Sequence, residues 1–66
     1  MEEIKSKLDA YLGLESQMRL FPDHYLSFHY YSPTGIPILS VYFRQVEERW
    51  IYLNSTHNFY PPEEFA

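Results

Sequence analysis

Residues 24–45, HYLSFHYYSPTGIPILSVYFRQ, carry the clearest structural pattern in the chain. On both sides of a central turn, side chains of two kinds alternate, which is typical of strands that bury one face. Pro33 presets the backbone angle for a turn, and Gly35 tolerates a positive φ. The pattern therefore predicts two antiparallel strands, at residues 24–31 and 36–45, joined by a tight turn.

The sequence on either side extends this hairpin into an α+β domain. Residues 49–55 alternate again and predict a third strand of an antiparallel meander. Residues 2–12 place apolar side chains at helical spacing, and Gly13 is suited to end that helix. Residues 14–21 allow another helical turn, but the alternation at residues 18–21 also allows a fourth strand. We expect the N-terminal helix to pack on one face of the sheet.

Alternation divides the strand residues between the two faces of the sheet. The set expected beneath the helix is Leu26, Phe28, Leu39, Val41, Phe43, Ile51 and Leu53. The set expected on the opposite face is Tyr25, Ser27, His29, Tyr31, Ile38, Ser40, Tyr42, Arg44, Trp50, Tyr52 and Asn54. A slip of one residue in a strand would exchange its two sets, so these assignments depend on the register.

Size and composition limit how such a domain can be stabilised. The chain has 66 residues and no cysteine, which permits one domain and excludes disulfides and thiolate zinc sites. We expect the domain to comprise residues 1–56, followed by an extended tail at residues 57–66 that contains Pro61 and Pro62. Domains this small often need stabilisation beyond that of their core. Because 20% of the residues are aromatic, close packing of large rings or self-association can supply it.

The charge pattern restricts the classes of partner. The formal net charge is −4, and the five basic side chains are scattered along the sequence. Direct nucleic-acid binding is disfavoured, because proteins that grip phosphates usually show a basic patch. On the aromatic face, the one opposite the helix, only Arg44 is expected, with Arg49 near its edge. The sequence has no apolar run long enough to cross a membrane and no secretory signal, so a cytoplasmic protein without membrane contact is expected.

Catalytic and metal chemistry find little support in the sequence. His24, His29 and His57 lack the spacing of metal ligands. Ser27 and His29 share a strand face, but no tight turn or oxyanion donor accompanies the serine. With two glycines, the chain cannot form a Gly-rich phosphate loop. We therefore expect no enzyme activity, no cofactor and no metal.

A protein-binding role agrees best with this pattern. The hypothesis is a small acidic module that acts as an inhibitor, antagonist or accessory subunit of a larger protein. In general character such modules resemble the inhibitors that phages and mobile elements carry. Tyrosine, tryptophan and arginine are the residue types that dominate binding hot spots. The residues expected to anchor the partner are Tyr25, Tyr31, Tyr42, Arg44, Trp50 and Tyr52.

Other uses of the aromatic face remain open at this stage. Two copies of the chain can bury it between them as a homo-oligomer. The tail can fold back, so that Phe59, Tyr60 and Phe65 cover part of it. DNA mimicry and binding of single-stranded nucleic acid are less favoured, since nine acidic side chains are partly offset by five basic ones.

Overall fold

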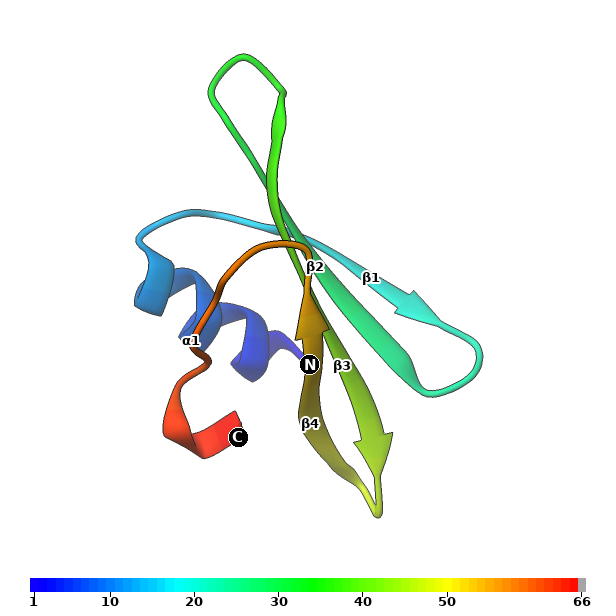
Figure 1. Cartoon of the computed structure of the whole chain (residues 1–66). Coiled ribbons are helices and arrows are strands. Elements are labelled where there is room, and N and C mark those ends of the chain that lie inside the picture. Colours follow the sequence, from blue (N-terminus) through cyan, green and yellow to red (C-terminus); the bar gives the residue numbers. More distant parts are fainter. Residues whose placement is uncertain (66) are drawn as a thin grey trace.

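The computed structural model describes residues 1–65 and shows one helix, four strands and a short C-terminal helical turn. The elements are α1 (Glu2–Leu12), β1 (Gln17–Phe21), β2 (Tyr25–Tyr31), β3 (Pro37–Val46), β4 (Arg49–Ser55) and the 3-10 helix η1 (Glu63–Phe65). The strands form one antiparallel sheet in the order β1-β2-β3-β4 (Figure 1). The predicted α+β fold is confirmed, and the fourth strand that the sequence allowed is present.

The helix and the central turn form for the local reasons that the sequence indicated. Gly13 follows α1 with a φ of 69°, a left-handed conformation that suits glycine, and its N–H donates to the carbonyl of Asp9. Between β2 and β3, the Gly35 N–H donates to the carbonyl of Ser32 at 2.9 Å. Within residues 1–65, neither the length nor the apolar character of any helix would suffice to cross a membrane.

The core lies between α1 and one face of the sheet, which we call the inner face. Its buried members are Leu8, Leu26, Phe28, Tyr30, Val41, Phe43 and Phe65. The ring of Phe43 meets the rings of Phe28 and Phe65 edge to face, with centroids 5.5 Å apart in each pair. Such pairs add to the free energy gained by burial. The inward residues predicted for β2 and β3 are thus confirmed.

The prediction of which side chains of β4 face inward was wrong. Trp50 pairs with Gln45 and Tyr52 pairs with Phe43, so both rings pack against the core. Ile51 pairs instead with Arg44 on the opposite face, and Leu53, at an irregularity in the register, is 49% exposed. The cause is the two-residue turn before β4, which fixes the register of the hairpin.

That turn is conformationally unusual. Glu47 and Glu48 have φ angles of 50° and 66°, although hairpin turns of this kind normally use asparagine and glycine. Two glutamates give no sequence signal for such a turn. The packing of Trp50 and Tyr52 against the core therefore outweighs the local preference of the turn residues.

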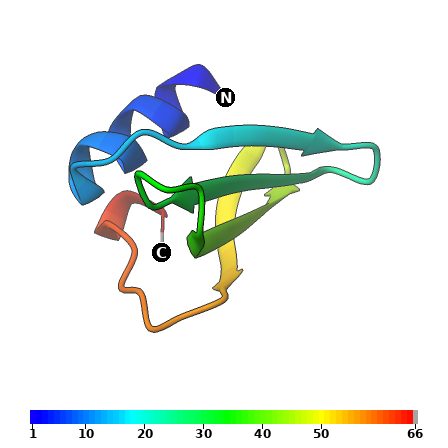
Figure 2. The ribbon, with the colours of Figure 1, turned by 90° about the horizontal axis from the view of Figure 1, so that it is seen from above.

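The C-terminal tail packs beside α1 on the inner face. Figure 2 shows the helix and the tail on the same side of the sheet. Phe65 reaches the core, and Phe59 lies between the rings of Tyr11 and Tyr52. The Tyr11 hydroxyl also donates a 2.7 Å hydrogen bond to the carbonyl of Tyr60. The tail thus shares the core of residues 1–56 and leaves the other face of the sheet uncovered.

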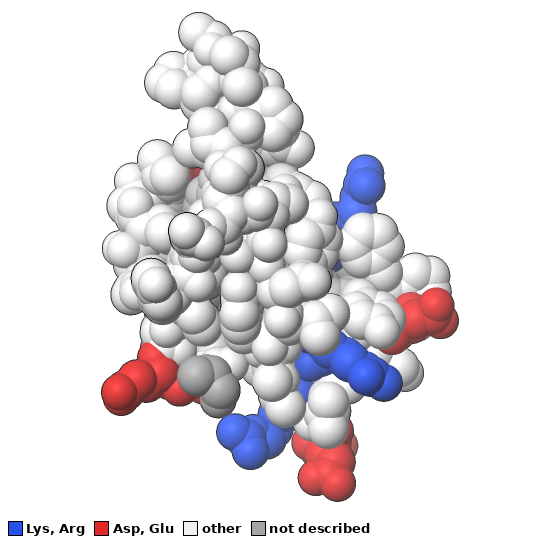
Figure 3. Space-filling model, in the orientation of Figure 1, with Lys and Arg blue, Asp and Glu red and all other residues white. Residues whose placement is uncertain are grey.

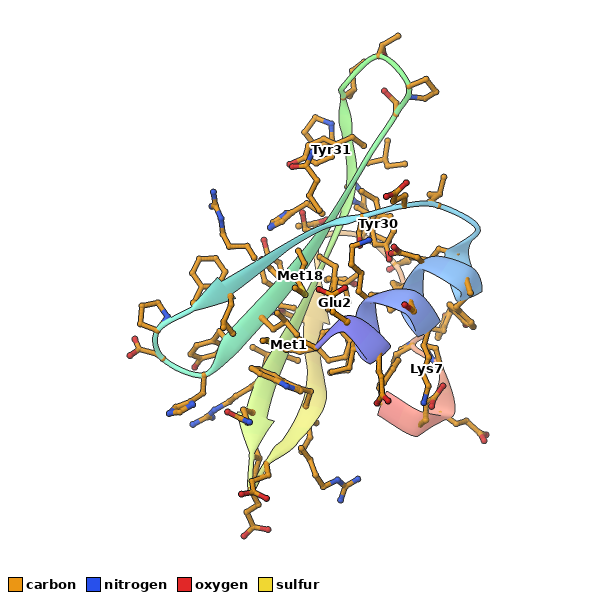
Figure 4. The ribbon with its side chains drawn as sticks, turned by 180° about the vertical axis from the view of Figure 1, so that it is seen from behind. Met1, Glu2, Lys7, Met18, Tyr30 and Tyr31 are labelled. Carbon is orange, nitrogen blue, oxygen red and sulfur yellow. The ribbon has the colours of Figure 1, made fainter. Side chains whose placement is uncertain are left out.

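A polar network joins α1 to β2 at the edge of the core. The Asp9 carboxylate accepts hydrogen bonds from Tyr30 and Ser16, both at 2.7 Å, and from Lys5 at 2.8 Å. Figure 4 shows Tyr30 directed toward α1 and Tyr31 on the other side of the strand. Burial raises the pKa of Asp9, but these hydrogen bonds outweigh it and hold the pKa below its ordinary value. Burial and the bond to Asp9 raise the pKa of Tyr30.

Candidate functional site

The face of the sheet opposite α1, which we call the open face, is built by all four strands. Cross-strand partners share a face, so the pairing register identifies its members. They are Gln17, Arg19, Phe21, Tyr25, Ser27, His29, Ser40, Tyr42, Arg44, Val46, Arg49, Ile51 and Asn54. Aromatic rings, hydroxyls and three arginine side chains therefore belong to a surface that neither the helix nor the tail covers (Figure 2).

A hydrogen-bonded chain of three side chains crosses the centre of the open face. The Ser27 hydroxyl lies 2.9 Å from His29 Nε2, and the Ser40 hydroxyl lies 2.8 Å from His29 Nδ1. The ring of Tyr42 meets the ring of His29 edge to face at 6.1 Å. Burial and the positive charge of Arg19 lower the pKa of His29, which favours the neutral ring.

This chain orders the open face and does not present a nucleophile. Ser27 has no exposed surface, so a substrate cannot reach its hydroxyl. The second nitrogen of His29 contacts another serine, where a catalytic triad would have a carboxylate. The expected proximity of Ser27, His29 and Ser40 is therefore present, and its geometry is that of a rigid support for Tyr42.

Two of the three arginines of the open face lie against aromatic rings. The guanidinium carbon of Arg44 is 5.9 Å from the centre of the Tyr25 ring, and that of Arg19 is 5.9 Å from the centre of the Phe21 ring. These distances are within the range of cation–π attraction. In Figure 3, basic and acidic groups both lie at the margin of uncharged side chains on the side of the molecule away from α1.

The charged side chains at the open-face positions are all basic. None of the open-face positions carries a carboxylate. Within residues 1–65, the cations that form ion pairs are Lys5 and Lys7, both on α1. Arg19 was missed from the sequence because residues 14–21 also allowed a helical turn. The alternation of Met18 and Leu20 with Arg19 and Phe21 was the signal that could have placed it on this face.

The residues predicted to anchor a partner do not all lie together. Tyr25, Tyr42 and Arg44 are on the open face, and Tyr31 lies at its end, beside an irregularity in the β2–β3 register, with 39% of its surface exposed. Trp50 and Tyr52 lie on the inner face, where the Tyr52 hydroxyl donates to Ser55. The structure therefore divides the predicted set of anchors between the two sides of the sheet.

A surface hollow of about 240 Å³ opens at one end of the open face. Its lining includes Gln17, Arg19, His29 and Tyr31. Gln17, Arg19 and Tyr31 can each direct a hydrogen-bond donor outward. His29 cannot, because both of its ring nitrogens already contact serines. Within residues 1–65, no group of His, Asp and Glu side chains is arranged to hold a metal ion. The hollow is therefore suited to an anionic or acceptor group.

A scan against protein-family models and searches of curated proteins and solved structures return no match for the chain. The open face is therefore interpreted from its own chemistry.

Proposed function

We propose that the chain is a small protein-binding module whose open face receives a partner protein. The observation that carries this proposal is an uncovered sheet face on which tyrosines and arginines are already ordered. Tyrosine and arginine are the residue types most often found as binding hot spots. In this role the module acts as an inhibitor, antagonist or accessory subunit of the larger protein that it binds.

The side chains of the open face are held before a partner arrives. Tyr42 rests against His29, which two serines fix in place, and Arg44 lies over Tyr25. A side chain that is already ordered loses less conformational entropy on binding. This arrangement supports Tyr25 and Tyr42 as anchors, with Arg44 as their polar neighbour.

Photo-crosslinking in the cells that produce the chain tests the proposal. A photo-reactive phenylalanine derivative replaces Tyr42 in one variant and Tyr60 in a matched control, since Tyr60 is 83% exposed on the tail. We expect a defined protein to be crosslinked from position 42 and not from position 60. With that protein purified, Tyr25→Ala and Tyr42→Ala should each weaken binding by more than about 1 kcal/mol. Equal crosslinking from both positions, or unchanged affinity in folded variants, would refute the proposal.

Self-association of the open face is the competing proposal. It would bury exposed apolar side chains such as Val46 and add stability to a small domain. A two-fold dimer formed through this face, however, would bring two copies of Arg19 and Arg44 toward one another with no carboxylate among them. Light scattering over a wide concentration range distinguishes the two. A stable dimer that Tyr42→Arg dissociates would favour the oligomer.

A further inference from the structure

We infer that the partner presents an extended acidic segment, one carboxylate of which enters the hollow beside Arg19. This inference rests on the proposed function and specifies the chemistry of the partner at the same face. The hollow is lined by Arg19, Gln17 and Tyr31, whose side chains end in a guanidinium, an amide and a phenolic hydroxyl. A carboxylate accepts several hydrogen bonds at once and pairs favourably with a guanidinium.

Arg19 is free to make this contact. It forms no ion pair within residues 1–65, and its guanidinium rests on the ring of Phe21. Arginine is more weakly hydrated than lysine, and its planar donors match a carboxylate in a two-point contact. A cation that lacks an acidic neighbour in its own chain is complementary to an acidic group on another.

The position of Arg44 relative to Arg19 sets the spacing between the two carboxylates of the segment. β2 lies between β1 and β3, so Arg19 and Arg44 are two strand spacings apart, which is about 10 Å. Their partners on β2, Ser27 and Tyr25, are two residues apart, or about 7 Å along the strand. The Cα atoms of the arginines are therefore about 12 Å apart, and an extended chain covers that distance in about four residues.

The surface between the arginines suits an apolar side chain. Phe21 and Tyr25 are partners across β1 and β2, and both are half-buried. The segment that fits is an extended stretch with two acidic residues four positions apart and an apolar residue between them. On a strand such residues point to the same side, so all three can face the module together.

A protein segment fits this face better than single-stranded nucleic acid does. Bases bind by stacking on broad ring faces, and a guanidinium group already lies over one face of Phe21 and one face of Tyr25. A nucleic acid carries a phosphate at every nucleotide, and the open face offers three arginines within a chain of net charge −4. Three separate cations correspond better to separate carboxylates of a protein segment than to a continuous phosphate backbone.

A peptide selection tests the inference. The full chain is immobilised, and a displayed library of random 12-residue peptides is enriched on it and sequenced. We expect the enriched peptides to carry pairs of Asp or Glu four positions apart. A synthetic peptide of the most enriched sequence should bind Arg19→Gln at least tenfold more weakly than the unchanged chain. Lys7→Gln, which removes a charge on α1, should stay within twofold.

The contrary outcomes are equally defined. The inference fails if no peptide is enriched, if the enriched peptides lack acidic residues, or if Arg19→Gln binds them normally. It also fails if a ten-residue oligothymidylate binds more tightly than the peptide at the same salt concentration. A protein crosslinked from position 42 whose contacting segment is not acidic would leave the proposed function intact and refute this inference alone.

Discussion

The inner and open faces of the sheet use similar rings in different surroundings. On the inner face, Phe43 touches two other phenylalanines and is fully buried. On the open face, Tyr25 lies against an arginine and Tyr42 against a histidine, and both rings are half-buried. An aromatic-rich sequence alone does not distinguish these roles. The neighbours of each ring decide whether it stabilises the fold or remains available to a partner.

The largest effect is expected where the tail completes the inner face. Phe65→Ala removes a ring that packs on Phe43, so the free energy of unfolding should fall by about 3–5 kcal/mol. Urea denaturation followed by circular dichroism measures this. Phe65→Leu, which retains most of the apolar volume, should lose less, and Tyr60→Ala should lose almost nothing. If Phe65→Ala lowered the free energy of unfolding as little as Tyr60→Ala, the tail would not belong to the core.

A smaller effect is expected at the polar edge of the inner face. Asp9→Ala leaves the hydroxyls of Tyr30 and Ser16 without their acceptor, so the free energy of unfolding should fall by about 2–3 kcal/mol. The lowered pKa of Asp9 also predicts that stability, complete above the ordinary value of 3.8, is lost as the pH falls through the lower folded value. Denaturation between pH 2 and pH 6 tests this, and Asp9→Asn should flatten the profile. An unchanged profile in Asp9→Asn would contradict it.

The smallest effect is expected on the open face. Arg19→Gln should change the free energy of unfolding by less than about 0.5 kcal/mol, because the side chain is exposed. It should raise the pKa of His29, while burial keeps that pKa below its ordinary value of 6.5. The groups around His29 are Gln17, Arg19, Ser27, Tyr31, Ser40 and Tyr42, with no carboxylate among them.

Nuclear magnetic resonance titration of the His29 ring measures this shift. In the unchanged chain the unfolded state takes up the proton more readily, so stability should fall as the pH drops from 6.5 through the folded pKa. Lys7→Gln on α1 serves as the control and should leave the His29 titration unchanged. A His29 pKa that does not respond to Arg19→Gln would show that the two groups are not electrostatically coupled.

Most of the fold could be predicted because the local signals and the packing agree. The alternation in β2 and β3, the turn at Gly35 and the helix ending at Gly13 all follow from residue preferences, and all are present. The orientation of β4 could not be predicted in this way. It depends on a two-residue turn at Glu47 and Glu48, and glutamate does not favour the conformation that such a turn requires.

The candidate site was only partly predictable for the same reason. Tyr25, Tyr42 and Arg44 lie on strands whose alternation is unambiguous, so their place on the open face followed from the sequence. Trp50 and Tyr52 moved to the inner face with β4. Arg19 joined the open face because β1 formed as a strand and paired with β2. Pairing between strands is a long-range property, and local residue preferences do not determine it.

The turn at Glu47 and Glu48 also has an evolutionary consequence. Because this joint sets the parity of β4, the insertion of one codon there would rotate the strand by one position. Trp50 and Tyr52 would then move outward, and Ile51 would replace them against the core. A single genetic event could in this way add two large rings to the binding surface without altering any existing residue. The emission spectrum of the sole tryptophan would report the exchange, because indole fluorescence shifts to longer wavelength on contact with water.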